Sequence, residues 1–385
     1  MRLEQALRAP GLAGIGEVKR RSPSAGDLRP DADPASLAAS YERAGAAAVS
    51  ILVDERFSGT WDDLRAARLT TRLPLLAKGF FSSDDDLRTA REAGADAVLL
   101  LLRDLDDATA SRLLGIAAEL GLDALVEAHD AEELRRAVEL DARVIGMNAR
   151  DLSTFHVDRR AQLELVAQAP RDRVIVAESG IEARAHGVAA ELAGADAILV
   201  GSALMRAPDP AEKLAGLLRR PVVKVCGLTR EEDVAAAADA GADLAGFILV
   251  EESPRRAREV LPVPDTMLSV AVHVGEVADA DGADLVQLYP REPGKVRGRD
   301  GVLLRGGEEV AKVLDLPWQE EDPGHLERAR AAEGRIVLAG GLGPENVRRA
   351  IEAVHPWAVD ASSSLELEPG VKDHARIRAY VEAAS

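Results

Sequence analysis

The chain has 385 residues, more than one hydrophobic core usually organises, so we expect two domains. Apolar residues make up 47% and charged residues 30%, no apolar run is long enough for a membrane span, and the N-terminus lacks a secretory signal, so we expect a soluble cytoplasmic protein. The net charge of −18 argues against nucleic acid and anionic membranes as partners, and a single cysteine excludes an internal disulfide.

Residues 1–219 carry a repeated pattern in which a helical segment ends in glycine and is followed by a short apolar run, as at 94–101 and 194–201. Glycine suits the end of a helix, and a continuous apolar run suits a strand buried on both faces. The strands expected from this pattern are 13–19, 46–53, 73–78, 95–102, 123–127, 142–148, 173–178 and 195–201. Eight strands alternating with amphipathic helices predict a (β/α)8 TIM barrel.

The pattern restarts in residues 220–385. The expected strands are 222–226, 243–250, 268–274, 283–288, 300–305, 311–316, 335–339 and 357–361. Several connections between them, such as 276–282, are too short for a full helix. We therefore predict a second, compact (β/α)8 barrel with shortened crossover helices, and an α/β protein of two consecutive barrels.

Polar side chains stand at the predicted ends of the strands in the first half. Because reacting groups of a parallel barrel lie where its strands end, we expect these residues to converge at one mouth. They are Glu17, Lys19, Lys78, Glu127, Asn148, Glu178 and Ser179. The alternative is a set of ordinary rim residues joined in salt bridges.

The loops after the seventh and eighth strands contain Ser179-Gly180 and Gly201-Ser202. Barrels commonly bind phosphate there through backbone N–H groups and a helix N-terminus, so we expect a phosphorylated small-molecule substrate. Lys19 and Ser22 can supplement this site. Glycine-serine pairs are also simple turn formers, which is the other interpretation.

Several motifs in the first half resemble indole-3-glycerol-phosphate synthase. They are residues 17–24 (EVKRRSPS), 57–59, Lys78 before Phe80, and residues 126–127, 146–152, 178–181 and 201–204. This resemblance implies that the half closes 1-(2-carboxyphenylamino)-1-deoxyribulose 5-phosphate to indole-3-glycerol phosphate, with loss of carbon dioxide and water.

The same resemblance implies roles for the matched residues. Lys78 is the expected general acid, and we expect neighbouring cations to lower its pKa. Glu127 is the expected base and Lys19 the acid of the dehydration step. Glu17, Asn148 and Ser179 are expected to position the substrate, and the further expected substrate-binding residues are Ser22, Phe80, Arg150 and Glu178.

Three features depart from the synthase pattern. Gly79 replaces a usual aspartate, and Ala149 replaces a usual asparagine. The segment before the first strand has only about a dozen residues, where the family carries a longer helical segment. We expect weaker closure over the substrate.

The second half resembles phosphoribosylanthranilate isomerase in residues 223–230 (VKVCGLTR), 253–255, 286–288, 339–342, 359–363 and 369–373. The resemblance implies rearrangement of N-(5-phosphoribosyl)anthranilate to the ketose that the first half uses. It makes Cys226 the base, Asp315 the acid and Arg255 a ligand of the anthranilate carboxylate.

A second phosphate site is expected in loops seven and eight of this half, at Gly340, Gly341, Ser362 and Ser363. Two departures weaken the likeness. Residues 318–324 replace a glycine-rich stretch, and Tyr289 replaces a histidine.

Together these observations predict a monomeric, cofactor-independent and metal-free bifunctional enzyme of tryptophan biosynthesis. One alternative is a synthase whose second barrel is a docking or folding module. Another is a sugar-phosphate binding protein without turnover.

Overall fold

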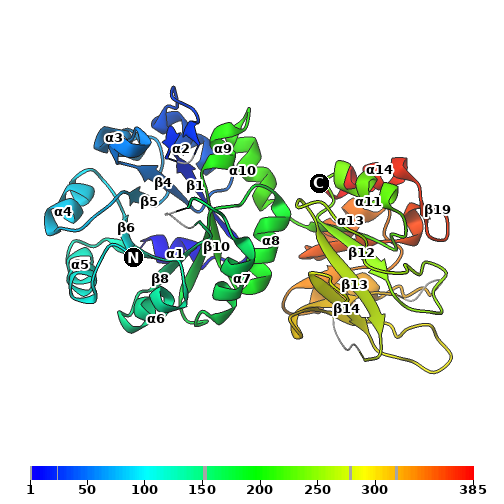
Figure 1. Ribbon diagram of the computed structural model, residues 1–385. Helices are drawn as coiled ribbons and strands as arrows, with labels where there is room; N and C mark the ends of the chain where they lie inside the picture. The colour runs from blue at the N-terminus through cyan, green and yellow to red at the C-terminus, as the bar shows by residue number, and fades with distance from the viewer. Residues whose placement is uncertain (1, 24, 151–153, 277–279, 317–319) are drawn as a thin grey trace. The chain divides into compact units, whose positions relative to one another are not determined.

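The computed structural model describes residues 2–23, 25–150, 154–276, 280–316 and 320–385. Two compact units divide the chain, Met1–Leu218 and Arg219–Ser385. Each unit contains a closed eight-stranded barrel (Figure 1). Among the described residues, no helix is long and apolar enough to cross a membrane.

All neighbouring strands of the first barrel run parallel, in the order β1-β10-β9-β8-β7-β6-β5-β4. The strands are β1 (Ala13–Val18), β4 (Ala48–Leu52), β5 (Leu75–Lys78), β6 (Ala97–Leu101), β7 (Asp123–Ala128), β8 (Val144–Asn148), β9 (Val174–Glu178) and β10 (Ala197–Val200). They correspond to the eight strands expected from the sequence. The predicted TIM-barrel fold of this half is confirmed.

Helices surround the first barrel, and Figure 1 shows them as a ring with α1 near its centre. They are α1 (Arg2–Leu7), α2 (Pro34–Arg43), α3 (Trp61–Arg68), α4 (Asp84–Glu92), α5 (Asp107–Glu119), α6 (Ala131–Glu139), α7 (Arg159–Gln168), α8 (Arg184–Ala193), α9 (Ser202–Arg206) and α10 (Pro210–Leu218). Local sequence sets their starts. Thr60 and Ser83, for example, form capping boxes with Asp63 and Asp86.

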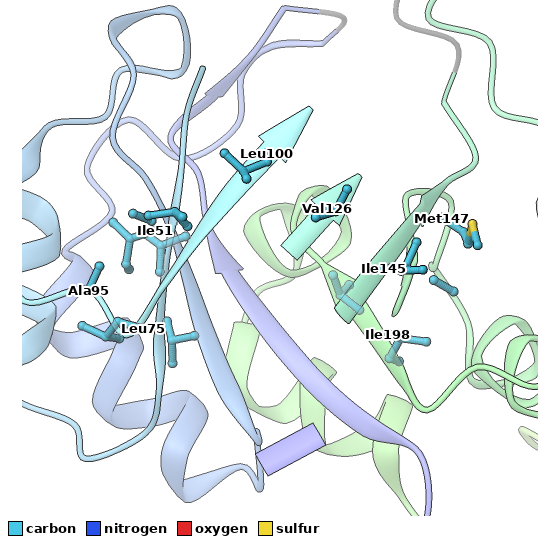
Figure 2. Packing of buried hydrophobic residues seen from close by; sticks show 14 of the residues in the cluster. Ile51, Leu75, Ala95, Leu100, Val126, Ile145, Met147 and Ile198 are labelled. Carbon is cyan, nitrogen blue, oxygen red and sulfur yellow. The ribbon is translucent and has the colours of Figure 1, made fainter. Parts of the chain in front are cut away.

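The core of the first unit has two layers. Side chains that leave the outer face of the strands pack under the helices, and Figure 2 shows Ile51, Leu75 and Val126 among them. Alternate residues fill the barrel interior, where Leu3 and Leu7 of α1 join them. The backbone N–H of Glu4 donates to Asp123, the first residue of β7, so α1 closes the amino-terminal end of the barrel. The carboxyl ends of the strands, where the predicted polar residues stand, form the opposite end of the barrel.

The second barrel has the order β11-β12-β13-β14-β15-β16-β17-β18. Its strands are β11 (Val222–Cys226), β12 (Leu244–Ile248), β13 (Leu268–Val274), β14 (Leu285–Tyr289), β15 (Gly301–Arg305), β16 (Glu308–Leu314), β17 (Ile336–Leu338) and β18 (Ala358–Ala361). Its helices are α11 (Glu231–Asp239), α12 (His325–Ala331), α13 (Val347–Val354) and α14 (His374–Ala384). The described residues between β12 and β16 contain no helix, which agrees with the expected shortening of the crossovers.

One strand departs from the (β/α)8 pattern: β15 runs antiparallel to both of its neighbours. The physical reason lies in its connection to β16. Only Gly306 and Gly307 separate the paired residues Arg305 and Glu308, and both glycines have positive φ angles of 57° and 85°. A two-residue turn of this kind joins antiparallel strands, whereas parallel neighbours need a long crossover.

Shorter elements complete the fold. They are β2 (Arg21–Ser22), β3 (Gly26–Asp27), the 3₁₀ helices Glu55–Phe57 and Ser363–Leu365, β19 (Glu366–Glu368) and β20 (Val371–Lys372). Some residues considered in the sequence lie outside the described part of the chain: Ser24, Asp151, Leu152, Trp318 and part of the 276–282 connection.

Candidate functional site

The carboxyl end of the first barrel brings one lysine against three buried carboxylates. Lys78 ends β5, and its Nζ lies 2.5 Å from Glu178 Oε2, 3.5 Å from Glu17 Oε2 and 3.8 Å from Glu127 Oε2. The three glutamates come from β1, β7 and β9 and are at most 3% exposed. Four strands therefore converge on one ammonium group.

Two more predicted residues join this group. Lys19 Nζ lies 2.8 Å from Glu17 Oε1. The Asn148 side-chain amide donates to Glu127 Oε1 at 2.9 Å, and Asn148 Oδ1 accepts the backbone N–H of Arg150. The carboxylates thus hold charged or polar partners on both sides, as expected for a converged mouth of a barrel.

The expected lowering of the Lys78 pKa is wrong. Burial lowers the pKa of Lys78, but attraction to Glu178, Glu17 and Glu127 outweighs it and raises the pKa well above its usual range. Sequence reasoning assumed neighbouring cations, whereas the nearest charged groups are carboxylates. Lys78 is therefore held as a cation.

The carboxyl groups of this cluster differ in pKa. Burial raises the pKa of Glu178 to about 7, despite the contact with Lys78. Burial also opposes ionisation of Glu17, yet Lys19 and Lys78 keep the pKa of Glu17 below its usual value. One carboxyl group of the cluster can therefore carry a proton near neutral pH while another stays ionised.

Glycines make room for these carboxylates. A Cβ built on Gly201 would lie 2.2 Å from Glu17 Oε1, and one on Gly146 would lie 2.1 Å from Glu178 Oε1. Real Cβ atoms do not approach so closely. The absence of a side chain at these two strand positions is therefore a condition for the observed carboxylate geometry.

The residues predicted to bind phosphate lie in loops at the same end of the sheet. Ser179 and Gly180 follow β9 directly, with positive φ angles of 68° and 70°. Gly201 follows β10, and Ser202 is the first residue of α9. Ser22 is buried in the short β2 after β1. These positions match the expected loops, while phosphate binding itself remains a prediction.

Phe80 and Arg150 are less tightly built into the site. Phe80 is 38% exposed, stacks on Phe57, and lies under the guanidinium of Arg56 at 3.4 Å from the ring centroid. The Arg150 side chain donates to the backbone oxygen of Phe155. The positive charge of Arg150 also interacts with Glu17 of the cluster.

Sequence reasoning missed His129. Its Nε2 lies 3.2 Å from Glu127 Oε1, and its Nδ1 lies 3.0 Å from Glu133 Oε2. The available signal was the spacing, since residues two apart on a strand point to the same face and Glu127 was already a candidate.

The second barrel encloses a cavity of about 850 Å³ at the carboxyl ends of its parallel strands. All seven residues predicted for this half line the cavity: Cys226, Arg255, Asp315, Gly340, Gly341, Ser362 and Ser363. They come from segments spread along the chain from Cys226 to Ser363. The barrel therefore assembles the residues that the motifs selected.

Cys226 stands beside a buried ion pair. Lys224, two residues earlier on β11, points to the same face, and its Nζ lies 2.7 Å from Asp360 Oδ2 and 2.9 Å from Gln287 Oε1. Burial raises the pKa of the Cys226 thiol, and the Lys224 cation opposes that effect. Gly246 leaves space for the sulfur, because a Cβ there would lie 2.7 Å from Sγ.

One carboxylate oxygen of Asp315 accepts two hydrogen bonds. Tyr289 donates its hydroxyl to Asp315 Oδ2 at 2.6 Å, and Arg297 Nη2 lies 2.7 Å from the same atom. Burial raises the pKa of Asp315, although Arg297 and Tyr289 favour the carboxylate. Tyr289, which replaces the family's histidine, thus contacts the candidate acid.

Arg255 is anchored by a glutamate. Its Nε donates to Glu366 at 2.9 Å, and Lys372 Nζ donates to the same carboxylate at 2.9 Å. Burial lowers the pKa of Lys372, although Glu366 favours its charged form. Sequence reasoning did not select Lys224, Arg297 or Lys372. Lys224 and Lys372 stand in matched motifs, while Arg297 has no motif signal.

In the described ranges, no group of three or more histidine, cysteine, aspartate or glutamate side chains is arranged to hold a metal ion.

Comparison with known proteins assigns the family. The sequence model of indole-3-glycerol phosphate synthase matches residues 2–217, and that of N-(5'phosphoribosyl)anthranilate (PRA) isomerase matches residues 322–383. The chain belongs to the indole-3-glycerol phosphate synthase family. With the isomerase match, it belongs to the proteins that fuse the two.

Three relatives show the extent of the likeness. The tryptophan biosynthesis protein TrpCF of Yersinia pestis is 34% identical over 98% of this chain and 86% of its own length. A multifunctional tryptophan biosynthesis protein of Phycomyces blakesleeanus is 31% identical over 98% of this chain, which spans 63% of that protein's length. An indole-3-glycerol phosphate synthase of Mycobacterium ulcerans is 44% identical over 55% of this chain and 79% of its own.

These matches confirm the predicted family and, with it, an enzyme that combines a lyase with an isomerase. Phosphorylated small molecules fit such an enzyme as substrates. The isomerase match begins only at residue 322, beyond most of the strands with shortened connections. The match therefore covers β17, β18 and the helices around them, and it leaves β11 to β16 outside.

Proposed function

We propose that the chain catalyses two consecutive reactions of tryptophan biosynthesis. Residues 220–385 isomerise N-(5-phosphoribosyl)anthranilate to 1-(2-carboxyphenylamino)-1-deoxyribulose 5-phosphate, and residues 1–219 convert this ketose to indole-3-glycerol phosphate. The observation that carries the proposal is the placement of each candidate acid and base at one mouth of its own barrel, Lys78 with Glu127 and Cys226 with Asp315.

In the synthase reaction, ring closure places negative charge on the ketone oxygen. Lys78 stays protonated beside its carboxylates, so it stabilises this charge through a hydrogen bond and then donates the proton that converts the oxygen to a hydroxyl. Loss of carbon dioxide follows. Glu127 then accepts the ring proton, and Lys19 protonates the departing hydroxyl, which leaves as water.

Binding residues surround these groups. Glu17, Asn148 and Ser179 position the substrate, with Glu178 holding Lys78 in place. The further proposed substrate contacts are Ser22, Phe80 and Arg150. Backbone N–H groups of the loops at Gly180, Gly201 and Ser202 receive the phosphate.

In the isomerase reaction, Asp315 protonates the ring oxygen, a role that suits a carboxyl group whose pKa is raised by burial. The Cys226 thiolate removes the neighbouring C–H proton. Lys224 favours the thiolate by its charge. Arg255 holds the anthranilate carboxylate, and the loops at Gly340, Gly341, Ser362 and Ser363 bind the phosphate.

We further propose that the enzyme works as a cytoplasmic monomer without cofactor. Each barrel collects its reacting groups from its own strands, so one chain supplies both sites. The only partners required are the phosphorylated substrates.

Two variants assayed on separate substrates test the proposal. Glu127→Gln should slow conversion of the ketose by roughly 10²- to 10⁴-fold while isomerisation continues at the wild-type rate. Cys226→Ala should abolish isomerisation while the supplied ketose is still converted. Equal melting temperatures serve as the folding control, because truncation of a buried thiol costs on the order of 1 kcal/mol.

The outcomes separate the alternatives. Wild-type chain that converts only the ketose would make the second barrel a docking or folding module. Saturable binding of both substrates without turnover would indicate a sugar-phosphate binding protein. Loss of both activities in either folded variant would show that the sites are coupled.

A further inference from the structure

His129 lies next to the proposed base and has no role in the scheme above. It follows β7, two residues after Glu127, and its side chain is 14% exposed. Residues at this spacing on a strand face the same side, so the imidazole enters the mouth of the barrel beside the Glu127 carboxylate.

Glu133 contacts the imidazole at Nδ1, the ring nitrogen that does not face Glu127. Glu133 Oε2 lies 3.0 Å from His129 Nδ1 and accepts the backbone N–H of His129 at 2.8 Å. Glu133 itself stands in the first turn of α6, where its backbone N–H donates to the N-cap residue Asp130 at 2.8 Å. The ring therefore has its orientation fixed by the start of a helix.

The two carboxylate oxygens of Glu127 contact different partners. Oε1 receives the Asn148 amide at 2.9 Å and lies 3.2 Å from His129 Nε2. The imidazole contact is an ion pair rather than a well-aligned hydrogen bond. Oε2 faces Lys78 Nζ at 3.8 Å. Oε1 is therefore fixed by Asn148 and His129, whereas Oε2 points toward the Lys78 cluster, where the substrate is proposed to react.

The charges of His129 and Glu127 also favour this contact. Burial lowers the pKa of His129, but Glu127 and Glu133 outweigh it and raise the pKa to about 10. The imidazole is thus a cation at neutral pH. Burial opposes ionisation of Glu127, while His129, Lys78 and Asn148 lower its pKa to about 2. The charged groups that face the ring are Glu127 of β7 and Glu133 of α6.

We infer that His129 is a positioning residue for the synthase reaction: clamped between Glu133 and Glu127, its imidazolium anchors Oε1 and leaves Oε2 as the atom that accepts the substrate's proton. The inference rests on the proposed role of Glu127 as the base. His129 keeps its own proton throughout, and the substrate's proton moves only to Glu127 Oε2.

The test measures kcat and KM for the supplied ketose across pH in three variants of the full chain. His129→Gln should lower kcat by about tenfold or more, within the range that general-base catalysis contributes. Its KM should stay within about twofold, because the substrate is still bound by the other residues. The acid limit of kcat should move to higher pH, by about one pH unit or more, because Glu127 loses a neighbouring cation.

Glu133→Gln keeps the imidazole but removes the carboxylate behind it. The pKa of His129 should then fall, so the alkaline limit of kcat should move to lower pH while the acid limit stays nearly in place. Glu132→Gln is the matched control. It removes one carboxylate from the same first turn of α6, where Glu132 pairs with Arg135 at the surface, and it should leave the profile of the wild type.

A purely structural role would lower kcat equally at all pH values and leave both limits in place, and that result would overturn the inference. Wild-type kcat and limits in both His129→Gln and Glu133→Gln would overturn it as well. If His129→Gln does not fold, the movement of the alkaline limit in Glu133→Gln decides. Melting temperature and isomerase rate report folding in each preparation.

Glu127→Gln separates this inference from the proposed function. If Glu127→Gln converts the ketose at the wild-type rate, Glu127 is not the base and the proposed mechanism fails with the inference. If Glu127→Gln is inactive while the His129 and Glu133 variants match the wild type, the mechanism stands and only the role of His129 is lost.

Discussion

At the scale of single residues, the synthase mouth is governed by an excess of buried carboxylates. Glu17, Glu127 and Glu178 face two lysines, Lys19 and Lys78, in a region with little solvent. Each lysine is therefore needed for charge balance as well as for chemistry. Removal of one partner from a buried ion pair leaves an uncompensated charge, which is far more costly than loss of a surface pair.

Lys78→Met should accordingly lose both activity and stability. We expect synthase kcat to fall by roughly 10²- to 10⁴-fold. The free energy of unfolding near neutral pH should fall by about 3 kcal/mol, because three carboxylates lose their shared cation. Denaturant unfolding and ketose turnover measure the two effects.

The double variant Lys78→Met/Glu178→Gln provides the control. It removes one of the unbalanced carboxylates and should recover part of the stability, but none of the activity. A Lys78→Met protein with wild-type turnover would show that Lys78 does not stabilise the reacting oxygen.

Glu178 gives the cluster a pH dependence of stability. Burial raises its pKa from 4.5 to about 7 in the folded protein, so the folded state binds the proton more tightly than the unfolded state. The resulting stability is fully present below about pH 4.5 and is lost as the pH rises through about 7. Glu178→Gln cannot ionise and should lack this loss.

The measurement is the difference in unfolding free energy between Glu178→Gln and the wild type at two pH values. From about pH 4.5 to about pH 8, this difference should shift in favour of the variant by on the order of 1 to 3 kcal/mol. A difference that is constant with pH would mean that Glu178 titrates normally in the folded protein.

At the scale of elements, strand position decides which side chains meet, and glycine decides how closely they approach. Gly146 on β8 and Gly201 after β10 stand where a Cβ would strike the carboxylates of Glu178 and Glu17. In a strand, glycine normally weakens the sheet because it adds no packing. Here it provides the space in which a neighbouring strand places its carboxylate.

Gly146→Ala should therefore act on the site more than on the fold. The new Cβ would lie 2.1 Å from Glu178 Oε1, so the carboxylate must turn away and its contact with Lys78 Nζ lengthens. We expect synthase kcat to fall by about tenfold or more, since misplacement of about 1 Å costs up to ~10²-fold.

Gly115→Ala is the control for the same substitution. Gly115 lies inside α5, with no atom within 4 Å of a Cβ built there. This variant should gain about 0.5 to 1 kcal/mol of stability and keep wild-type turnover. If Gly146→Ala also keeps wild-type turnover, the space beside Glu178 is not required for catalysis.

At the scale of the whole molecule, the chain consists of two independently closed sheets with separate cores. Two core clusters draw their residues from the first unit, and one draws its residues from the second. Each sheet also closes on itself through hydrogen bonds between its own strands. We therefore expect each barrel to carry its activity without help from the other.

Residues 1–219 expressed alone should retain synthase activity within about twofold of the full chain, because their core and mouth are built from their own strands. Turnover of the ketose and the melting temperature measure this. A folded but inactive fragment would show that the second barrel contributes to the first site.

The sequence by itself determined the order of the strands and the residues that the motifs selected. Apolar runs ended by glycine identify buried parallel strands, and polar residues at the ends of those runs must meet once the sheet closes. This reasoning placed Lys78 and Cys226 at the last residues of their strands and Glu127 one residue before the end of β7, since the period of a strand is a local property.

Only the tertiary structure decided the charges around those residues. The pKa of Lys78 depends on carboxylates up to 100 positions away, and the ring of His129 is held by a helix and a strand together. The reversal of β15 follows from pairing across the turn at Gly306 and Gly307. Burial and long-range distance set the charges, and neither is encoded in the spacing of residues along the chain, whereas the Gly306-Gly307 turn is a local feature that the expected strand at 311–316 overlooked.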